Sequence, residues 1–432
     1  MGQLSAAGER GAKSLHRQVA AAVAPAQLIQ LSVRVENLAH IRAAYGEGAA
    51  DAAHVECVRL TRNFLGGQGI VSPNEVGRFG TLAWAVGSNS NCANMKPAEQ
   101  AHALVLALAT NPVRFADQIF HVVPTVACVP IALNDADDGA VSQTSNVHSD
   151  RSFDGESAGY GEDWGFRYRR DMREACTLLR ALSNDRIEIA WQPVQSSADP
   201  DQTLYFEGQL RLIGPACEIS SVGSLLAAAE RLGLIRALDG HAVSQAISEL
   251  EKNPDVNLGI NISSQSARFD EWWLDAAERL EGRPDIASRL IIEITEGARP
   301  TAPSHVSRFA DEVRKLGCRI ALNGFGTGHA SIRHLLALRP DIVKVDGFFL
   351  ARASNSERDE TAFRHLVGLV KSLAPIVVVE GVDTAALSRL ASDAGADCAQ
   401  GASCGPWTII RPWRVDGRLG GCAASTMSSA RN

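Results

Sequence analysis

The second half of the 432-residue chain alternates two kinds of segment, and this rhythm most constrains the fold. Short runs rich in β-branched residues are separated by stretches with helical apolar periodicity. The runs are Ile187–Val194, Leu204–Ile213, Asn257–Ile262, Leu290–Thr295, Arg319–Phe325, Asp341–Val345, Ile376–Val382 and Asp397–Gln400. Eight strands with intervening helices in about 230 residues predict an α/β protein built on a (β/α)8 barrel. An open doubly wound sheet is the alternative, but no GxGxxG follows the first run.

A smaller α/β domain is expected before the barrel. Strand and helix patterns alternate there, with strands at Leu28–Val35, Leu82–Val86 and Phe120–Ile131 and helices at Leu38–Tyr45 and Ala49–Leu65. A polar stretch rich in Asp, Ser and Gly follows, and a helical pattern returns at Asp171–Leu182. We expect an N-terminal lead-in at 1–26, the small domain at 27–133, a polar linker at 134–165, the barrel at 170–413 and a disordered tail at 414–432.

Composition favours a soluble cytoplasmic protein. The net charge of -7 gives no reason to expect a nucleic acid polymer or an anionic membrane as partner. Nine scattered cysteines form no CxxC pair, so zinc-ligand spacing is absent and reduced thiols are expected. No apolar run reaches the roughly 18 residues that a transmembrane helix needs, and the N-terminus lacks the apolar core of a signal peptide.

Polar side chains stand near the ends of the predicted strands, where a barrel places its active face. They are Glu207, Arg211, Asn261, Glu293, Glu296, Asn323, Lys344, Asp346, Glu380 and Gln400. Carboxylate and amide oxygens are the ligands that Mg²⁺ and Mn²⁺ prefer, and a lysine could hold a metal-bound water or a phosphate oxygen. Any one of these residues could merely hydrate the barrel rim. A polar residue at every strand from the second to the last instead predicts a functional site.

The same stretches resemble motifs of the EAL domain family. Trp191-Gln192-Pro193-Val194 is similar to the family's YQPI, and Phe206–Arg211 lies where FEALLR belongs. Further matches are Asn261-Ile262-Ser263 to NLS, Glu293-Ile294-Thr295-Glu296 to EITE, Lys344-Val345-Asp346 to KID, and the pairs Glu380-Gly381 and Gln400-Gly401. The resemblance covers residues from about 170 to 413 and implies a TIM-like barrel. The family contains cyclic di-GMP phosphodiesterases and their inactive relatives.

The resemblance also implies roles for single residues. Metal ligands would be Glu207, Asn261, Glu293 and Asn323, with Gly324 at the position that serves the second ion. Ligand-binding residues would be Gln192, Arg211, Asp346 and Gln400, with Arg211 a natural phosphate clamp. Lys344 and Glu380 would take part in catalysis if the chain is active.

One motif departs from the family where catalysis depends on it. The family's DDFG is replaced by Asn323-Gly324-Phe325-Gly326. Asparagine keeps one oxygen without charge, and glycine supplies no ligand. Two-metal cleavage of a phosphodiester needs both ions. We therefore expect one Mg²⁺ or Mn²⁺ ion or none. The family's Glu-Ala-Leu has also become Glu207-Gly208-Gln209.

Residues 27–133 resemble a GGDEF (diguanylate cyclase) domain more weakly. Tyr45–Asp51 is similar to YGHxxGD, and Arg78–Trp84 lies where RxGGDEF belongs. Leu82 and Ala83 replace its acidic pair, and Arg34 replaces a metal-binding aspartate. Because a cyclase needs carboxylates to hold metal, we do not expect cyclase activity. A different small α/β domain is the alternative.

Together these features predict a degenerate GGDEF–EAL protein in cyclic di-GMP signalling. We expect it to bind the nucleotide as a receptor, or to act as a protein-interaction module, without turnover. The alternatives are a slow phosphodiesterase that uses one metal ion with Lys344 and Glu380, and a scaffold that binds neither nucleotide nor metal. A regulatory protein partner is expected, and a homodimer follows from family analogy.

Overall fold

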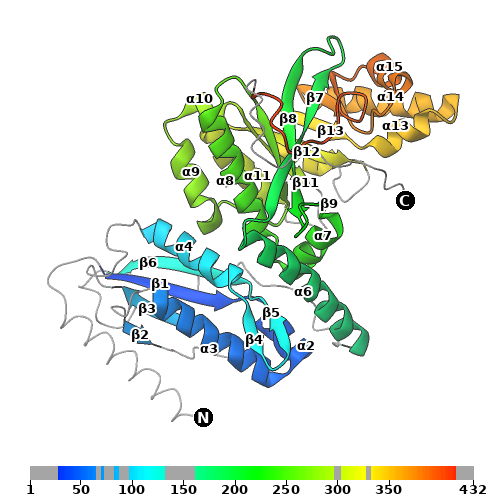
Figure 1. Cartoon of the computed structure of the whole chain (residues 1–432). Helices are drawn as coiled ribbons and strands as arrows, with labels where there is room; N and C mark the ends of the chain where they lie inside the picture. The colour runs from blue at the N-terminus through cyan, green and yellow to red at the C-terminus, as the bar shows by residue number, and fades with distance from the viewer. Residues whose placement is uncertain are drawn as a thin grey trace.

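The computed structural model describes residues 28–64, 70–72, 82–86, 97–131, 161–295, 303–326 and 332–414. They form two bodies that lie one against the other, with a long helix between them (Figure 1). None of the described helices combines the length and the apolar character that a membrane crossing requires. Glu296 and residues 327–331 lie outside the described residues.

The N-terminal body is built on a four-stranded antiparallel sheet of order β2-β3-β1-β6. Its strands are β1 (Leu28–Val35), β2 (Ile70–Ser72), β3 (Leu82–Val86) and β6 (Pro124–Ile131). The helices are α2 (Leu38–Tyr45), α3 (Glu47–Phe64) and α4 (Pro97–Thr110), and a hairpin adds β4 (Val113–Phe115) and β5 (Gln118–Phe120). The strand expected at Phe120–Ile131 instead begins at Pro124, and Phe120 ends β5. Proline lacks the N–H that a continuous ladder needs, and it fits the first residue of a strand.

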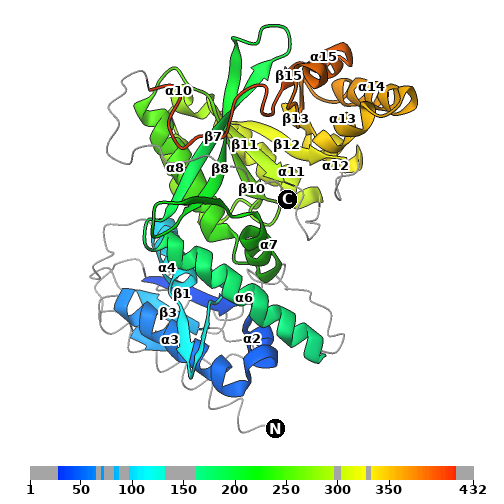
Figure 2. The same cartoon turned by 45° about the vertical axis from the view of Figure 1, so that its right-hand side comes forward.

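Helix α6 (Glu162–Leu182) joins the two bodies (Figures 1 and 2). It begins inside the range expected to be linker, because aromatic residues extend its packed face. The rings of Trp164 and Tyr168 stack at 5.0 Å, and Tyr168 also lies 5.9 Å from the His40 ring of α2. At the other side Asp171 forms a 2.7 Å ion pair with Arg231 of the barrel. One helix therefore contacts both bodies.

The C-terminal body is a closed barrel of eight strands in the described part of the chain. They are β7 (Ile187–Ser196), β8 (Thr203–Ile213), β10 (Leu258–Ser263), β11 (Leu290–Thr295), β12 (Arg319–Phe325), β13 (Ile342–Val345), β14 (Ile376–Val379) and β15 (Cys398–Ala399). Pairing of β8 with β10 and of β15 with β7 closes the barrel. The TIM-like barrel predicted from the alternating runs is confirmed.

Strand β7 departs from the regular (β/α)8 pattern, because it runs antiparallel to both β8 and β15. Only residues 197–202 connect it to β8. A crossover to a parallel strand needs a dozen or more residues, so this connection can form only a hairpin. The short strand β9 (Ile219–Ser221) pairs antiparallel with the last residues of β8, Arg211–Ile213.

Helices surround the barrel. They are α7 (Gly223–Leu232), α8 (Arg236–Lys252), η1 (Glu271–Trp273), α9 (Leu274–Leu280), α10 (Pro284–Ala287), α11 (Pro303–Lys315), α12 (Ile332–Leu338), α13 (Gly347–Ala353), α14 (Glu357–Lys371) and α15 (Ala385–Asp393). All four residues of β13 are buried, as expected for a parallel strand covered on both faces. The N-terminal body contacts this ring where His102 of α4 hydrogen-bonds the carbonyl of Glu271 at 2.8 Å.

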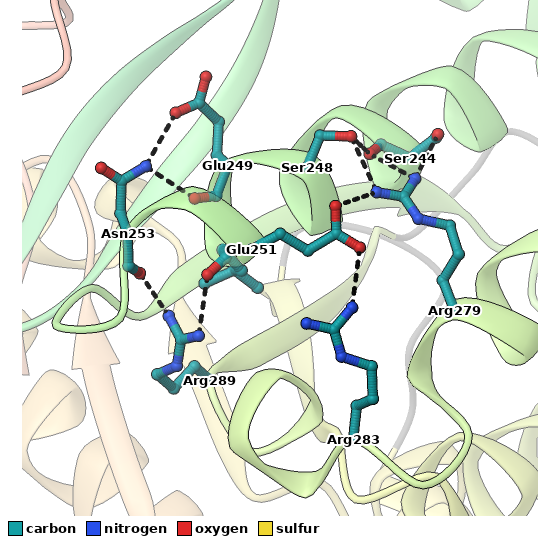
Figure 3. Close-up of polar contacts among 9 residues, drawn as sticks. Ser244, Ser248, Glu249, Glu251, Asn253, Arg279, Arg283 and Arg289 are labelled. Carbon is teal, nitrogen blue, oxygen red and sulfur yellow. Dashed lines mark hydrogen bonds and ion pairs between the residues drawn. The ribbon is translucent and has the colours of Figure 1, made fainter.

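Three arginines tie α8 to α9, α10 and β11 (Figure 3). Arg279 donates to Ser248 at 2.9 Å and to Glu251 at 3.0 Å. Arg289 donates to the carbonyls of Leu250 and Asn253 at 2.9 and 2.7 Å, which satisfies orphan acceptors at the end of α8. This network is structural support on the outside of the barrel.

Two departures from the family motifs compensate each other inside the barrel. Trp191 stands where the motif has tyrosine, and Gly208 stands where it has alanine. A Cβ at Gly208 would lie 2.7 Å from the fully buried Trp191 ring and from Ile260, and 2.8 Å from Ile189. The larger ring therefore occupies the space that an alanine methyl group would need.

We predict that Gly208→Ala lowers the free energy of unfolding by about 1–3 kcal/mol through overpacking. Adding Trp191→Tyr should recover part of that loss, so the double variant is more stable than the sum of the single effects. Chemical denaturation measures this cycle. Gly240→Ala on α8 is the control, because a Cβ there meets nothing within 4 Å. Additive effects, or a Gly208→Ala variant as stable as wild type, would contradict the compensation.

Candidate functional site

A buried lysine lies at the centre of the site. The ammonium of Lys344 on β13 contacts the carboxylates of Glu207, Glu293 at 3.1 Å and Glu380 at 2.8 Å. The lysine is fully buried, and so is Glu293. A charge in this environment is stable only when opposite charges surround it. These residues form what we call the lysine cluster: Glu207, Glu293, Lys344 and Glu380.

The barrel strands bring the cluster together. Glu207 lies on β8, Glu293 on β11 and Lys344 on β13, while Glu380 directly follows β14. The first three lie within their strands, inside the same runs of sequence that were predicted to be strands. Alternation along a strand turns their side chains into the barrel, so that four separate segments meet at one point.

Two asparagine amides join the cluster through a ladder of hydrogen bonds. Asn261 donates from Nδ2 to Glu207 Oε1. Asn323 donates from Nδ2 to Asn261 Oδ1 at 2.7 Å and to Glu293 Oε2 at 3.1 Å. The four residues that the family resemblance assigns to the first metal ion therefore lie together. In these hydrogen bonds the amide oxygen of Asn261 already accepts from Asn323. The NH₂ group of Asn323 points toward Asn261 and Glu293.

This arrangement fits a divalent ion poorly. Mg²⁺ and Mn²⁺ require converging oxygen ligands, and an amide NH₂ directed at them supplies none. Among the residues that the structure describes, no group of three or more His, Cys, Asp and Glu side chains has the arrangement of a metal site. One carboxylate oxygen of the cluster, Glu293 Oε1, is buried without a hydrogen-bond partner.

Gly324, at the position of the missing second carboxylate, has a left-handed backbone. Its φ angle is +76°, and the register between β12 and β13 shifts between Leu322 and Phe325. A glycine in this region is typical of a β-bulge. A Cβ at this position would meet nothing within 4 Å, so the restriction on a side chain comes from the backbone and not from space.

The surroundings shift the pKa values of the carboxyl groups in opposite directions. Burial alone would raise the pKa of Glu207, but the Lys344 ammonium and hydrogen bonds hold that pKa below its ordinary value. Burial and the Glu207 charge raise the pKa of Glu293 to about 8. Burial also raises the pKa of Glu380. The surrounding carboxylates outweigh burial at Lys344 and raise its pKa well above the ordinary value. The site thus keeps a permanent internal cation.

Two glutamines extend the cluster toward the C-terminal segment. Gln400 donates from Nε2 to Glu207 at 2.6 Å and to Gln192 Oε1 at 3.1 Å. Gln192 in turn donates to the carbonyl of Gly405 at 2.9 Å. Both predicted ligand-binding residues therefore lie at the site.

Arg211 and Asp346, also predicted to bind ligand, have local partners instead. The Arg211 guanidinium lies over the Trp407 ring, 5.2 Å from its centroid, and donates to the Leu210 carbonyl at 3.0 Å. Asp346 caps helix α13 by accepting from the Phe348 N–H at 2.7 Å.

A cavity of about 760 Å³ opens beside the cluster. This volume lies within the range of small-molecule sites, roughly 300–1,000 Å³. Predicted site residues in its wall are Gln192, Glu207, Asn261, Asn323, Gly324, Glu380 and Gln400. The wall also contains Trp407, Glu230 and Asp239, which the sequence did not single out. A tryptophan beyond the last strand and two acids on helical patterns carried no motif that could have identified them.

The EAL domain family matches residues 175–406. The chain belongs to the EAL domain family. An uncharacterized protein y4lL of Sinorhizobium fredii is 27% identical over 366 residues, 84% of this chain and 43% of the relative. Cyclic di-GMP phosphodiesterase PdeF of Escherichia coli is 26% identical over 241 residues, 54% of this chain and 32% of that protein. The chain spans less than half the length of these relatives.

Solved structures agree with the EAL fold. The FimX EAL domain from Pseudomonas aeruginosa, bound to c-di-GMP, superposes with a TM-score of 0.50 at 21% identity, over 55% of this chain and 97% of that domain. At this identity the likeness concerns the fold alone. It supports the closed EAL barrel described above.

Asp239 of the EAL barrel is a buried acid in the wall of the cavity. Its Oδ2 accepts from the Ser263 N–H at 2.9 Å and from the Ser266 hydroxyl at 2.6 Å. Burial raises its pKa from 3.8 to about 7, although both hydrogen bonds oppose the shift. The folded protein consequently holds a proton that the unfolded chain releases.

We predict that this carboxyl makes the protein less stable as pH rises from about 4 to 7. In that window the folded state binds more protons than the unfolded state, so the free energy of unfolding falls by up to about 1.4 kcal/mol per pH unit. Asp239→Asn lacks the effect, and its stability relative to wild type should rise across the window. Denaturation at several pH values tests this, with the exposed Asp275→Asn as control. A constant difference between Asp239→Asn and wild type would contradict it.

Proposed function

We propose that the protein is a cyclic di-GMP receptor that does not hydrolyse its ligand. The observation that carries the proposal is the hydrogen bond from the Asn323 amide to Asn261 and Glu293, in the place of a metal-ligating carboxylate. The cavity beside this ladder has the size of a small-molecule site. Family membership and relatives named as cyclic di-GMP phosphodiesterases support the choice of nucleotide.

The absence of turnover follows from how the side chains are used. Hydrolysis of a phosphodiester needs an activated water and stabilisation of the leaving oxygen. The Lys344 ammonium is shared among three carboxylates, and the Glu380 carboxylate is paired with it at 2.8 Å. Neither group is free to activate water. We propose that Lys344 replaces, as a fixed internal charge, the electrostatic role that a metal ion would fill.

A scaffold without nucleotide is the second candidate. It is favoured by the charge of the site, where one lysine faces three carboxyl groups and the phosphates of a cyclic dinucleotide would add negative charge. The amide donors of Gln192 and Gln400 are also paired within the protein. In that case the barrel would act through a protein partner.

We further propose that the N-terminal body is a GGDEF-like domain without cyclase activity. Arg34 on β1 lies 3.4 Å from Glu36 in an ion pair, where a cyclase would place a metal-binding aspartate. Leu82 and Ala83, at the acidic signature positions, begin β3. We assign this body a regulatory or dimer-forming role in the cytoplasm, with the domain division expected from the sequence.

Titration calorimetry with cyclic di-GMP, with and without Mg²⁺, tests the receptor proposal. We expect binding that does not require Mg²⁺, and recovery of intact nucleotide by chromatography. Gln192→Leu should weaken binding about tenfold or more by removing hydrogen-bonding groups from the cavity. Gln202→Leu, the same change at an exposed position, should leave binding unchanged. Absence of binding would favour the scaffold, and linear product formed at about 1 per second or faster would establish an enzyme.

Restoring the family's aspartates tests the account of the metal site. Asn323→Asp should increase Mn²⁺ binding, because it replaces an NH₂ donor by a carboxylate beside Asn261 and Glu293. Adding Gly324→Asp should lower stability by about 1–2 kcal/mol, since φ at this position is +76°. Calorimetry with Mn²⁺ and denaturation measure the two effects. If Asn323→Asp binds no more Mn²⁺ than wild type, the site geometry described above is wrong.

A further inference from the structure

Trp407 forms part of the cavity wall, and hydrogen bonds fix the backbone on both sides of it. Two residues earlier, the Gly405 carbonyl accepts a 2.9 Å hydrogen bond from Gln192. The next residue, Thr408, exchanges two backbone hydrogen bonds with Trp191 at 2.8 and 3.0 Å. Trp191 is fully buried, so this anchor is rigid. The backbone at Trp407 is consequently fixed relative to the lysine cluster.

A guanidinium supports the Trp407 ring from outside the cavity. The Arg211 guanidinium lies 5.2 Å from the ring centroid, and its Nη1 donates to the Leu210 carbonyl at 3.0 Å. Trp407 belongs to the cavity wall, whereas Arg211 does not. A cation over an indole is an attractive contact of about 0.5–2 kcal/mol. Arg211 can therefore set the orientation of the ring without filling the space beside it.

Trp407 differs from the other tryptophan of the same segment. The Trp413 ring packs edge-on against Trp191, with 5.2 Å between ring centroids. It is tilted against Phe206 at 5.0 Å, and both contacts are ordinary core packing. The ring of Trp407, in contrast, contacts a cation, the guanidinium of Arg211. Its side chain is only partly buried, and it lines a cavity whose wall combines polar side chains with isoleucines and leucines. An aromatic surface left in such a place is suited to a flat heteroaromatic ligand.

We propose that Trp407 is the stacking platform for one purine base of the ligand, and that Arg211 is a positioning residue that holds the ring. This inference rests on the proposed receptor function and adds a specificity determinant to it. It also replaces the role of phosphate clamp that the sequence suggested for Arg211. Every base has a π-face, but a purine covers more of an indole than a pyrimidine does, so the platform favours purine dinucleotides.

The test is cyclic di-GMP binding to Trp407 variants of the full chain. Trp407→Leu keeps an apolar side chain and loses the π-face, and should weaken binding between about 5- and 150-fold. Trp407→Phe should stay within about threefold of wild type, because it keeps a stacking surface. Trp413→Phe is the matched control outside the cavity and should not change affinity.

Two readouts separate stacking from a merely structural role. Ligand should quench tryptophan fluorescence in wild type, and Trp407→Phe should lose that quenching while still binding. A double-mutant cycle of Arg211→Leu with Trp407→Leu should be strongly non-additive, because Arg211 acts through the ring. Additive effects would instead show that Arg211 contacts the ligand independently and would overturn its assigned role.

The possible failures are distinguishable. If wild type binds cyclic di-GMP and Trp407→Leu binds equally well, the platform is wrong while the receptor function stands. If wild type does not bind, the receptor function fails and the platform fails with it. Weak binding by both Trp407→Leu and Trp407→Phe, with unchanged quenching in Trp407→Phe, would also overturn the platform.

Discussion

A single ammonium group inside the barrel sets the terms for the rest of the site. Lys344 has no exposed surface, and it is surrounded by Glu207, Glu293 and Glu380. Without a cation, three carboxyl groups this close could not all ionise. Lys344 helps to hold the pKa of Glu207 below its ordinary value, whereas burial and the Glu207 charge raise the pKa of Glu293. The lysine thus lowers the electrostatic cost of keeping three acidic residues together inside the EAL barrel.

The asparagine at 323 is compatible with this internal cation in a way that an aspartate would not be. A fourth carboxylate would add charge that Lys344 alone cannot balance. The amide instead donates to Asn261 and Glu293 and satisfies acceptors already present. The change from acid to amide reverses the direction of hydrogen bonding at this position. The loss of one charge and the gain of a donor both reduce repulsion between the amide at this position and the lysine cluster.

Much of this architecture could be predicted from the sequence. The β-branched runs at Leu290–Thr295 and Arg319–Phe325 are strands with those same bounds. Periodicity could not show the direction of β7, although the short connection at residues 197–202 contained that information. The start of α6 was hidden because its aromatic residues pack on another body, a contact between residues far apart in the sequence.

The candidate site divides in the same way. Residues on strands, such as Glu207 and Lys344, come together because the barrel fixes where each strand points. Arg211 also lies on a strand, yet its long side chain turns to Trp407, which belongs to a segment without regular structure. Asp239 on α8 could not be identified either, because its partner Ser263 ends β10 and its partner Ser266 lies in the loop that follows. Local sequence patterns do not show which of several partners, distant in the sequence, a side chain contacts.

The segment after β15 has a consequence for the order in which the protein assembles. Residues 400–414 contribute Gln400 to the cluster, Trp407 to the cavity and Arg414 to a 2.7 Å ion pair with Glu249 on α8. Synthesis proceeds from the N-terminus, and the remaining cavity wall is available before this segment leaves the ribosome. During synthesis the cavity therefore stays open, with its acidic residues exposed, until residues 400–414 fold onto the barrel and complete the wall.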